Sequence, residues 1–290
     1  MRGDHLRAAL SARWEALGPD DLAGLFGASR QQVGESGLAA TPAFLMALYQ
    51  ALEIDIEFLV LHPEALACSI LERYLLGAGL QDPSFEALRG FAGRVHREAG
   101  RAWLCPVLAL RTPEDPGSVG SPRFSPDGSL FLLESTGQFL QVWQLPRGTL
   151  LWRAATTDIT SCGNSDGFSF SADSRYLLTS GVDYAGMTDW NDYGASFDAR
   201  TGALVHYSDN YGTKGTPPEG VVKADSTSPL SAKRDKDTDP WILTSGEAEA
   251  LLPPRYTEVA GAPNGVLVAA VPRTQRGIRV PAGVLFELRR

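Results

Sequence analysis

A short turn motif recurs along the second half of the chain, and its spacing limits the possible folds more than any other feature. Residues 124–128 read FSPDG, and residues 170–174, which lie 46 positions later, read FSADS. A third copy, APNG at 262–265, lies 91 residues beyond Ser171, close to two further periods. The period also predicts a degenerate copy at 217–220, which reads PPEG. An apolar run follows each copy, as expected for a repeat fold.

A second landmark repeats in step with the first. A β-type run leads to a glycine and then to another β-type run around Gly148, Gly202, Gly246 and Gly283. This is the pattern of a tight hairpin whose glycine can take a positive φ. Each unit therefore contains four predicted strands. One such sheet cannot bury both of its faces alone, whereas sheets stacked around an axis can.

The two landmarks resemble those of the WD-repeat β-propeller family, in which SPDG-type turns and a segment like VWQLPRG at 142–148 recur in each blade. The resemblance covers residues 122–290 and implies an all-β, propeller-type domain of about four blades that acts as an interaction module. The chain lacks the family's Gly-His and Trp-Asp dipeptides at their usual places. An ordinary β-sandwich that contains SPDG turns is the alternative fold.

Four blades raise the question of closure, because an incompletely closed ring leaves exposed strand edges that attract further strands. We expect either a distorted four-blade ring or pairing with a second copy of the chain, so self-association is one predicted interaction.

Helical periodicity dominates the first 105 residues. Leu6, Leu10, Trp14 and Leu17 recur at intervals of three and four, which predicts an amphipathic helix over His5–Leu17. Capping residues and first-turn prolines predict the other helices. These are Pro19–Phe26, a helix capped by Ser29 that ends near Gly37, Ala43–Leu52 opened by the cap Thr41 and Pro42, Ile56–Leu61 capped by Asp55, Pro63–Leu76, and a last helix opened by Asp82 and Pro83 that ends at about Gly100.

The sequence therefore predicts an α+β multidomain protein. Residues 1–105 form an all-α helical bundle, residues 106–121 a linker and first strand, and residues 122–290 the four blade repeats. Residues 225–240 are rich in charge and are expected to be a mobile insertion in the third repeat.

Residues 21–33, which read DLAGLFGASRQQV, resemble the Cro-like helix-turn-helix family. The match extends over about residues 6–61, with two further helices beyond it. The resemblance implies that Ser29, Arg30, Gln31 and Gln32 face the major groove of DNA.

Charge disfavours DNA binding by this segment. Residues 34–38 read GESGL where the family carries basic residues, and residues 1–110 hold 9 Arg, no Lys and 13 acidic residues. The net charge of the whole chain is −8, and phosphate contacts need basic side chains. The alternative is a small helical bundle used for docking or dimerisation.

Signatures of catalysis and cofactor binding are missing from the sequence. It has no GxxxxGK[ST] loop, no GxSxG elbow and no HExxH motif, and its four histidines are isolated. Cys68, Cys105 and Cys162 form no CxxC pair and are expected to be small buried side chains in a reducing cytosol. We therefore expect no catalytic residues, no metal site and no cofactor.

The chain has no apolar stretch of membrane-spanning length, and its first residues do not resemble a signal peptide. We expect a cytoplasmic protein of bacterial type without a membrane partner.

One segment of the second repeat is the predicted partner-binding site. Residues 183–194 read DYAGMTDWNDYG and lengthen the central loop of that repeat. Aromatic and carboxylate side chains on a loop of a rigid β scaffold commonly form a recognition surface. The predicted binding residues are Asp183, Tyr184, Asp189, Trp190, Asn191, Asp192 and Tyr193. Asp189, Asn191 and Asp192 have roughly calcium-like spacing, but the rest of a calcium loop is missing; a long solvated hairpin loop is the plain alternative.

These observations predict a non-enzymatic scaffold that recognises a protein or peptide partner. A DNA-binding transcriptional regulator, with the propeller as sensor, is the alternative. A propeller hydrolase or lyase is a third class, disfavoured because no acid–base constellation is visible.

Overall fold

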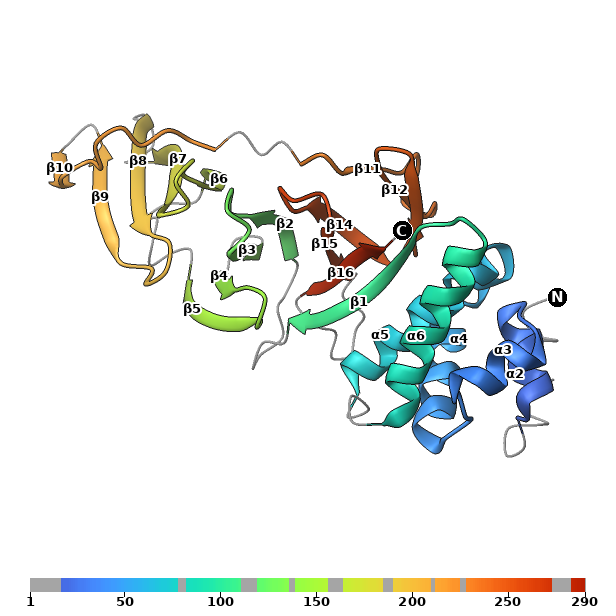
Figure 1. Ribbon diagram of the computed structural model, residues 1–290. Coiled ribbons are helices and arrows are strands. Elements are labelled where there is room, and N and C mark those ends of the chain that lie inside the picture. The colour runs from blue at the N-terminus through green and yellow to red at the C-terminus, as the bar shows by residue number, and fades with distance from the viewer. Residues whose placement is uncertain are drawn as a thin grey trace. The chain divides into compact units, whose positions relative to one another are not determined.

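The computed structural model describes residues 17–77, 82–110, 119–135, 139–155, 164–184, 190–209, 212–224, 228–272 and 283–289. Over these ranges the protein is a helical segment followed by four antiparallel sheets, which confirms the predicted fold class (Figure 1). The predicted helix His5–Leu17 lies outside the described residues except for its last residue, and so do Cys162, Asp189 and the turn before Gly283.

The helical segment contains five described α-helices and one 3₁₀ turn. They are α2 (Pro19–Phe26), α3 (Arg30–Ser36), α4 (Pro42–Leu61), η1 (Pro63–Ala65), α5 (Leu66–Leu76) and α6 (Pro83–Glu98). The predicted caps are present, because the side chains of Ser29, Thr41 and Asp82 each accept a hydrogen bond from a backbone N–H of the first turn. None of the described helices is long and apolar enough to cross a membrane.

Helix α4 corrects one prediction. The sequence predicted two helices, with Asp55 as the cap of the second, whereas α4 runs unbroken from Pro42 to Leu61. Asp55 lies inside this helix with 5% of its surface exposed. No glycine or proline occurs between Pro42 and Leu61, and the Asp55 carboxylate pairs with the Arg255 guanidinium instead of capping a helix.

The four sheets follow the order of the repeats. The first contains β2 (Val119–Phe124), β3 (Leu130–Ser135), β4 (Phe139–Gln144) and β5 (Thr149–Ala155). The second contains β6 (Asn164–Phe170), β7 (Tyr176–Tyr184), β8 (Trp190–Asp198), β9 (Leu204–Asp209) and β10 (Gly212–Gly215). The third contains β11 (Ser231–Lys233), β12 (Trp241–Ser245) and β13 (Ala248–Leu252). The fourth contains β14 (Tyr256–Gly261), β15 (Leu267–Pro272), β16 (Gly283–Arg289) and β1 (Trp103–Leu110).

The repeated turns have one shared conformation. Gly128, Ser174 and Gly265 occupy equivalent positions with φ values of 69°, 62° and 67°. In each turn this residue donates its N–H to the carbonyl three residues earlier, with distances of 2.8 to 2.9 Å. The hairpin glycines Gly148, Gly202 and Gly246 also have positive φ. The repeat predicted from the sequence is therefore a repeat of backbone geometry.

The third unit departs from this pattern. The predicted degenerate turn at 217–220 is not followed by a strand; the next residues lie along the second sheet, where Ala172 N–H donates to the Val222 carbonyl over 2.8 Å. In the same stretch, Lys223 forms an isolated antiparallel β-bridge with Ser171. The third sheet instead begins at β11, inside the segment that the sequence predicted as an insertion. Arg234 is held there, with its guanidinium 4.5 Å from the centre of the Trp241 ring.

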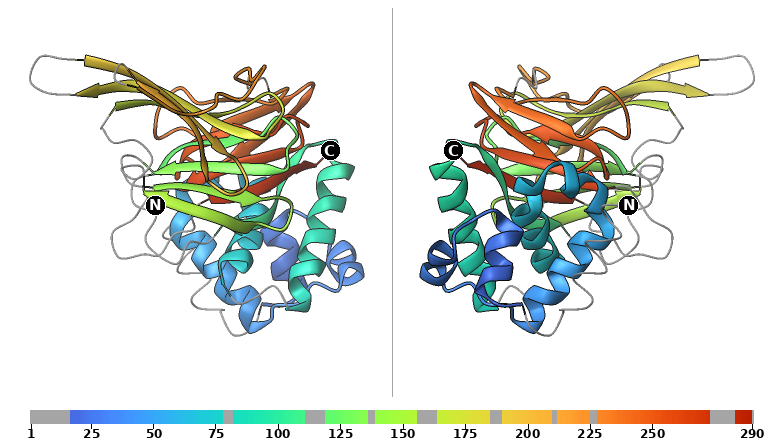
Figure 2. Two further views of the ribbon diagram at one scale, coloured as in Figure 1. Left: turned by 90° about the vertical axis from the view of Figure 1, so that its left-hand side faces the viewer. Right: turned by 90° about the vertical axis from the view of Figure 1, so that its right-hand side faces the viewer.

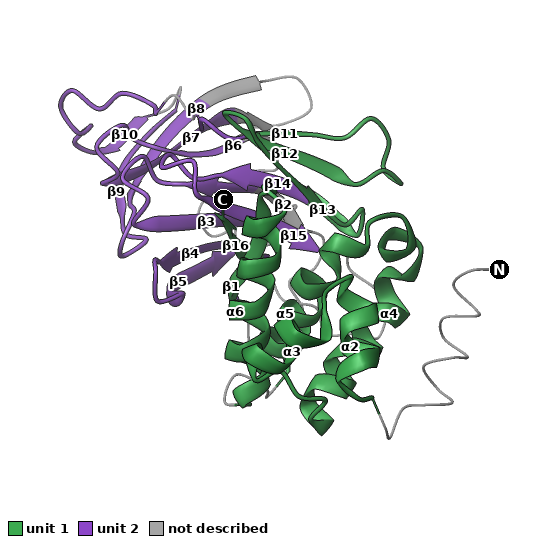
Figure 3. Cartoon of the chain, turned by 45° about the vertical axis from the view of Figure 1, so that its right-hand side comes forward, with its two compact units in different colours: residues 1–109, 231–257, 284–290 green, residues 110–230, 258–283 purple. Residues whose placement is uncertain are grey.

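The described chain divides into two compact units (Figure 3). Unit 1 contains residues 1–109, 231–257 and 284–290, and unit 2 contains residues 110–230 and 258–283. In unit 1 the helices share a core, and the partly buried Leu251 of β13 packs against it. In unit 2 the first two sheets share a core that includes Leu130, Val142, Phe168 and Phe197.

A buried charge cluster links the segments of unit 1. The Arg255 guanidinium contacts the carboxylates of Asp55 in α4 and Glu72 in α5, and Glu72 also pairs with Arg73 at 2.8 Å. Glu72 is 2% exposed, and its burial raises its pKa above 4.5 against the opposing effect of Arg73. Tyr256, beside Arg255, is fully buried. The helices and the third-sheet region are thus held together by paired charges as well as by apolar packing.

Candidate interaction surfaces

The second sheet carries a longer central hairpin than the first. Strands β3 and β4 have six residues each, whereas β7 and β8 have nine each. Strands β3 and β7 each follow an equivalent repeat turn. The pairing of β7 with β8 continues without interruption from Tyr176↔Asp198 to Tyr184↔Trp190. In Figure 2 the ends of β7 and β8 reach beyond the other strands of their sheet. The extra length lies in the segment that the sequence predicted as a binding site.

The structure places most of the predicted binding residues in strands rather than in a loop. Asp183 and Tyr184 end β7, while Trp190, Asn191, Asp192 and Tyr193 begin β8. Asp183 lies opposite Asn191, and Tyr184 lies opposite Trp190. The predicted loop is thereby shortened, because polar and aromatic residues in this register extend the antiparallel ladder. Asp189 lies outside the described residues.

Tyr193 anchors the base of this hairpin. It is 5% exposed, and its ring stacks on that of Tyr207 in β9, with centroids 6.2 Å apart and planes 20° from parallel. Aromatic pairs of this kind stabilise cross-strand packing. Tyr193 is therefore buried near the start of β8, which differs from the contact role that the sequence suggested for it.

A second ordered surface of unit 2 is formed by the turns of the first two sheets. Asp127, Asp173 and Asp198 all have lowered pKa values. For Asp127 and Asp198 the raising effect of burial on the pKa is outweighed by hydrogen bonds from hydroxyl and backbone groups, most of which belong to the same turn. For Asp173 the hydrogen bond from the Ser171 hydroxyl, 2.6 Å long, is the main cause. These carboxylates serve as turn acceptors.

Two contacts join neighbouring turns across the sheets. The indole N–H of Trp152 in β5 donates to the Ala199 carbonyl over 3.0 Å, and the Asp127 N–H donates to the Ser174 hydroxyl over 3.1 Å. Ser174 has a positive φ where the other copies have glycine. Its hydroxyl provides an acceptor that glycine lacks. The sequence did not predict either contact. Each joins residues 47 positions apart, and this separation, close to the repeat period, was the one sequence signal for them.

The predicted DNA-contacting residues lie at the start of α3 and all have local partners. Ser29 and Gln32 form a reciprocal capping box, and Gln32 Nε2 also donates to Glu98 over 2.7 Å. Arg30 pairs with Asp20 at 3.4 Å, and Gln31 donates to Glu35 over 2.8 Å. The acidic partners place negative charge beside Arg30, Gln31 and Gln32. DNA binding stays a prediction, and these contacts lend it no support.

The buried thiols and histidines have ordinary structural environments. Cys68 and Cys105 are buried free thiols, as predicted, and burial raises the pKa of Cys105 to about 11. His96 stacks on Trp103, and burial lowers its pKa. Among the described residues, no group of three or more His, Cys, Asp or Glu side chains is arranged to hold a metal ion.

No family model matches the chain, and no curated protein matches it. Several solved structures are similar to it, including the following two. The crystal structure of RRP9 WD40 repeats has a TM-score of 0.37 and 11% identity, covering 63% of this chain and 98% of that one. The structure of U3-55K has a TM-score of 0.33 and 10% identity, covering 66% of this chain and 99% of that one. This distant likeness concerns the fold alone.

Proposed function

We propose that the protein is a non-enzymatic interaction scaffold whose extended β7–β8 hairpin recognises a protein or peptide partner. The observation that carries the proposal is the length of this hairpin, which has nine residues per strand where the equivalent hairpin of the first sheet has six. The added residues include the predicted contact residues Asp183, Tyr184, Trp190, Asn191 and Asp192, and Asp189 directly precedes Trp190 in the sequence.

The strand register supports this role physically. Residues in a continuous antiparallel ladder have little backbone entropy left to lose when a partner binds, so more of the contact free energy appears as affinity. Tyr and Trp supply large contact areas at interfaces, and carboxylate and amide groups supply hydrogen-bond acceptors. The stacked pair Tyr193 and Tyr207 fixes the base from which the hairpin extends.

The proposal is tested by affinity purification of the full chain from its native host. Trp190→Ala and Tyr184→Ala should each remove at least one co-purifying protein that the unaltered chain retains. Tyr49→Ala is the matched control, because Tyr49 is an aromatic residue of α4 with half of its surface exposed. Circular dichroism should show that all variants keep the fold. An unchanged set of co-purifying proteins with both hairpin variants would contradict the proposal.

Self-association is a separate proposal, for which β10 offers the most direct route. It is the outermost strand of the second sheet, all four of its residues are exposed, and the described chain pairs it only with β9. Open strand edges can pair with strands of another copy. Light scattering at high protein concentration should give a mass above that of one chain; a strict monomer would exclude this pairing.

A further inference from the structure

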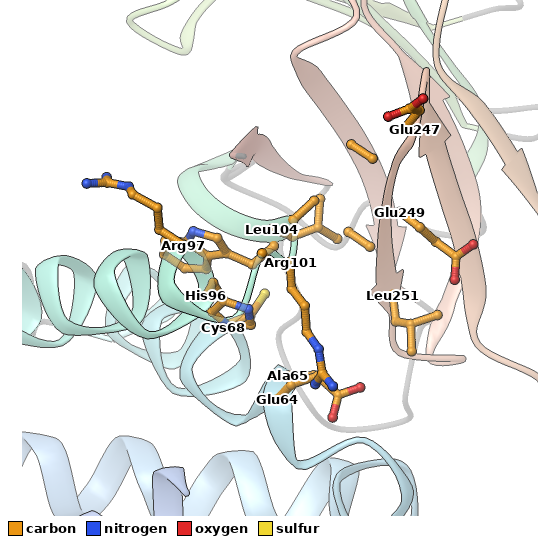
Figure 4. Close-up of a pocket in the computed structure, with 15 residues that line it drawn as sticks. Glu64, Ala65, Cys68, His96, Arg97, Arg101, Leu104, Glu247, Glu249 and Leu251 are labelled. Atoms are coloured by element: carbon orange, nitrogen blue, oxygen red, sulfur yellow. The ribbon is translucent and has the colours of Figure 1, made fainter. Parts of the chain in front are cut away.

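Unit 1 contains a cavity of about 920 Å³ that none of the predicted sites uses (Figure 4). One wall is the run of five residues Glu247–Leu251, most of it in β13, and another is the run 100–104 that leads into β1. Residues of η1, α5 and α6 complete the lining, among them Ala65, Cys68 and His96. The volume is in the range of ligand pockets.

The cavity exists because the residues around it are small. Gly100 and Ala102 lie on one wall, Ala248 and Ala250 lie on the β13 wall, and Ala65 lies on the helical side. None of these side chains extends beyond Cβ, so the space between the two walls stays open, where leucine or valine would fill it.

The cavity runs along the edge of β13. Successive side chains of a strand point to opposite faces of the sheet, so a space lined by five consecutive residues cannot lie over only one face. Strand β13 ends the strand order of the third sheet, and within the described chain its other edge pairs with no strand. Such an edge can accept an extended peptide as an added strand.

The carboxylates on the β13 side of the cavity favour a basic ligand. In Figure 4 the side chains of Arg101 and Glu64 point toward one another, Arg97 points away from β13, and Glu249 points away from the helical side of the cavity. Glu247 and Glu249 lie on the strand wall, and the ion pairs of the described residues include neither of them. His96, whose pKa is lowered by burial, is neutral at pH 7 and adds no positive charge. Strand β13 and the turn before it therefore carry two carboxylates, and side chains of a strand added to its free edge would lie beside them.

We propose that this cavity binds an extended basic peptide, which adds a strand to the free edge of β13 and places Lys or Arg side chains beside Glu247 and Glu249. The site lies outside the β7–β8 hairpin and does not depend on the function proposed for that hairpin.

The full chain should be used to select binders from a random dodecapeptide library displayed on phage. We expect the selected peptides to be enriched in Lys and Arg at alternating positions, since every second side chain of an added strand faces the same way. In fluorescence anisotropy, the double substitution Glu247→Gln and Glu249→Gln should weaken binding of a labelled selected peptide about tenfold or more. Ala248→Trp, which fills the cavity, should abolish binding.

The control pair is Glu57→Gln with Glu219→Gln, which removes two exposed carboxylates elsewhere and should leave binding unchanged. Trp190→Ala should also leave it unchanged, which separates this site from the hairpin. Thermal unfolding confirms that each variant is folded. The proposal is overturned if no peptide is selected, if the selected peptides lack basic residues, or if binding survives both the double substitution and Ala248→Trp.

Discussion

At the scale of single residues, Gly202 shows why one hairpin glycine of the repeat is indispensable. Its φ is +73°, and a Cβ added there would lie 2.8 Å from Cδ2 of Trp152. The same tryptophan donates to Ala199 three residues earlier. The indole therefore covers the turn of the neighbouring sheet, and only glycine leaves room for it.

We expect Gly202→Ala to lower the free energy of unfolding by about 3 kcal/mol, through the unfavourable φ and the steric clash together. Gly220→Ala is the matched control, because Gly220 has φ +65° but nothing within 4 Å of an added Cβ. It should cost only about 1 kcal/mol. Urea denaturation measures both. Equal losses in the two variants would show that Trp152 does not restrict this position.

The sequence predicted residue-scale features wherever the repeat pattern applied. The positions of Gly128, Gly148, Gly202 and Gly265 were all visible as turns, because glycine is the residue that a positive φ favours. The role of Ser174 was visible only as a deviation from this pattern. The Trp152 contact could not be predicted, since it depends on how two sheets pack and not on local conformation.

At the scale of elements, α4 and α5 depend on a residue far along the chain. Asp55 and Glu72 are nearly fully buried, and Arg255 contacts both carboxylates. Arg255→Met should lower the free energy of unfolding by about 3–5 kcal/mol, because removing one member of a buried ion pair leaves the others uncompensated. Arg200→Met, at an exposed arginine, should change it by less than about 0.5 kcal/mol.

The pH dependence of this loss follows from Glu72. Its pKa is raised in the folded state, so the stability that its protonated form provides is present below pH 4.5 and is lost as the pH rises through the folded value. Without Arg255 the ionised carboxylate is less well compensated. The difference in the free energy of unfolding between Arg255→Met and the unaltered chain should therefore become smaller as the pH is lowered from 7.5 to 5. A deficit that is constant with pH would exclude this account.

Helix α3 allows a direct test of the alternative function. Its single basic side chain, Arg30, pairs with Asp20, and Gln31 and Gln32 bond to glutamates. We expect a gel-shift titration across salt concentrations to show no tight, salt-sensitive binding of DNA. Binding of that kind, lost in Arg30→Ala and Gln31→Ala, would reverse the order of the two functions.

Elements were predicted well where local signals set their limits and poorly where distant residues did. The caps Ser29, Thr41 and Asp82 and the glycines of the turns identified most helix and strand ends correctly. Asp55 was misassigned because a helix cap and a buried ion-pair partner look alike in sequence. The strand β11 was missed because its residues lie in a charged stretch. Arg234 of this stretch is stabilised by the Trp241 ring and by the carbonyls of Tyr256 and Thr257 in β14.

At the scale of the whole molecule, the two compact units do not correspond to two continuous stretches of the sequence. Unit 1 draws on three separate stretches of the chain. Leu251 packs against the core of the helical segment, and Arg255 pairs with two of its buried carboxylates. The sequence showed the change from helices to strands near Trp103. It could not show that part of the strand-rich half belongs with the helices, because only tertiary contacts define such a unit.

Native-state hydrogen exchange can test this arrangement. Amides of α4 and α5 should exchange with nearly the same free energy of opening as amides of β12 and β13, because elements of one cooperative unit open together. Arg255→Met should lower both values by similar amounts. If β12 and β13 exchange much faster than the helices in the unaltered chain, the two regions are not one cooperative unit.

The pairing of Arg255 with Glu72 also has a consequence for biosynthesis. The two residues are 183 positions apart, and a ribosome adds about 5–20 residues each second. Glu72 therefore leaves the ribosome roughly 10–40 s before the arginine that compensates it. During that interval the newly made helices carry two carboxylates without their partner, so their final packing must wait until most of the chain has been translated.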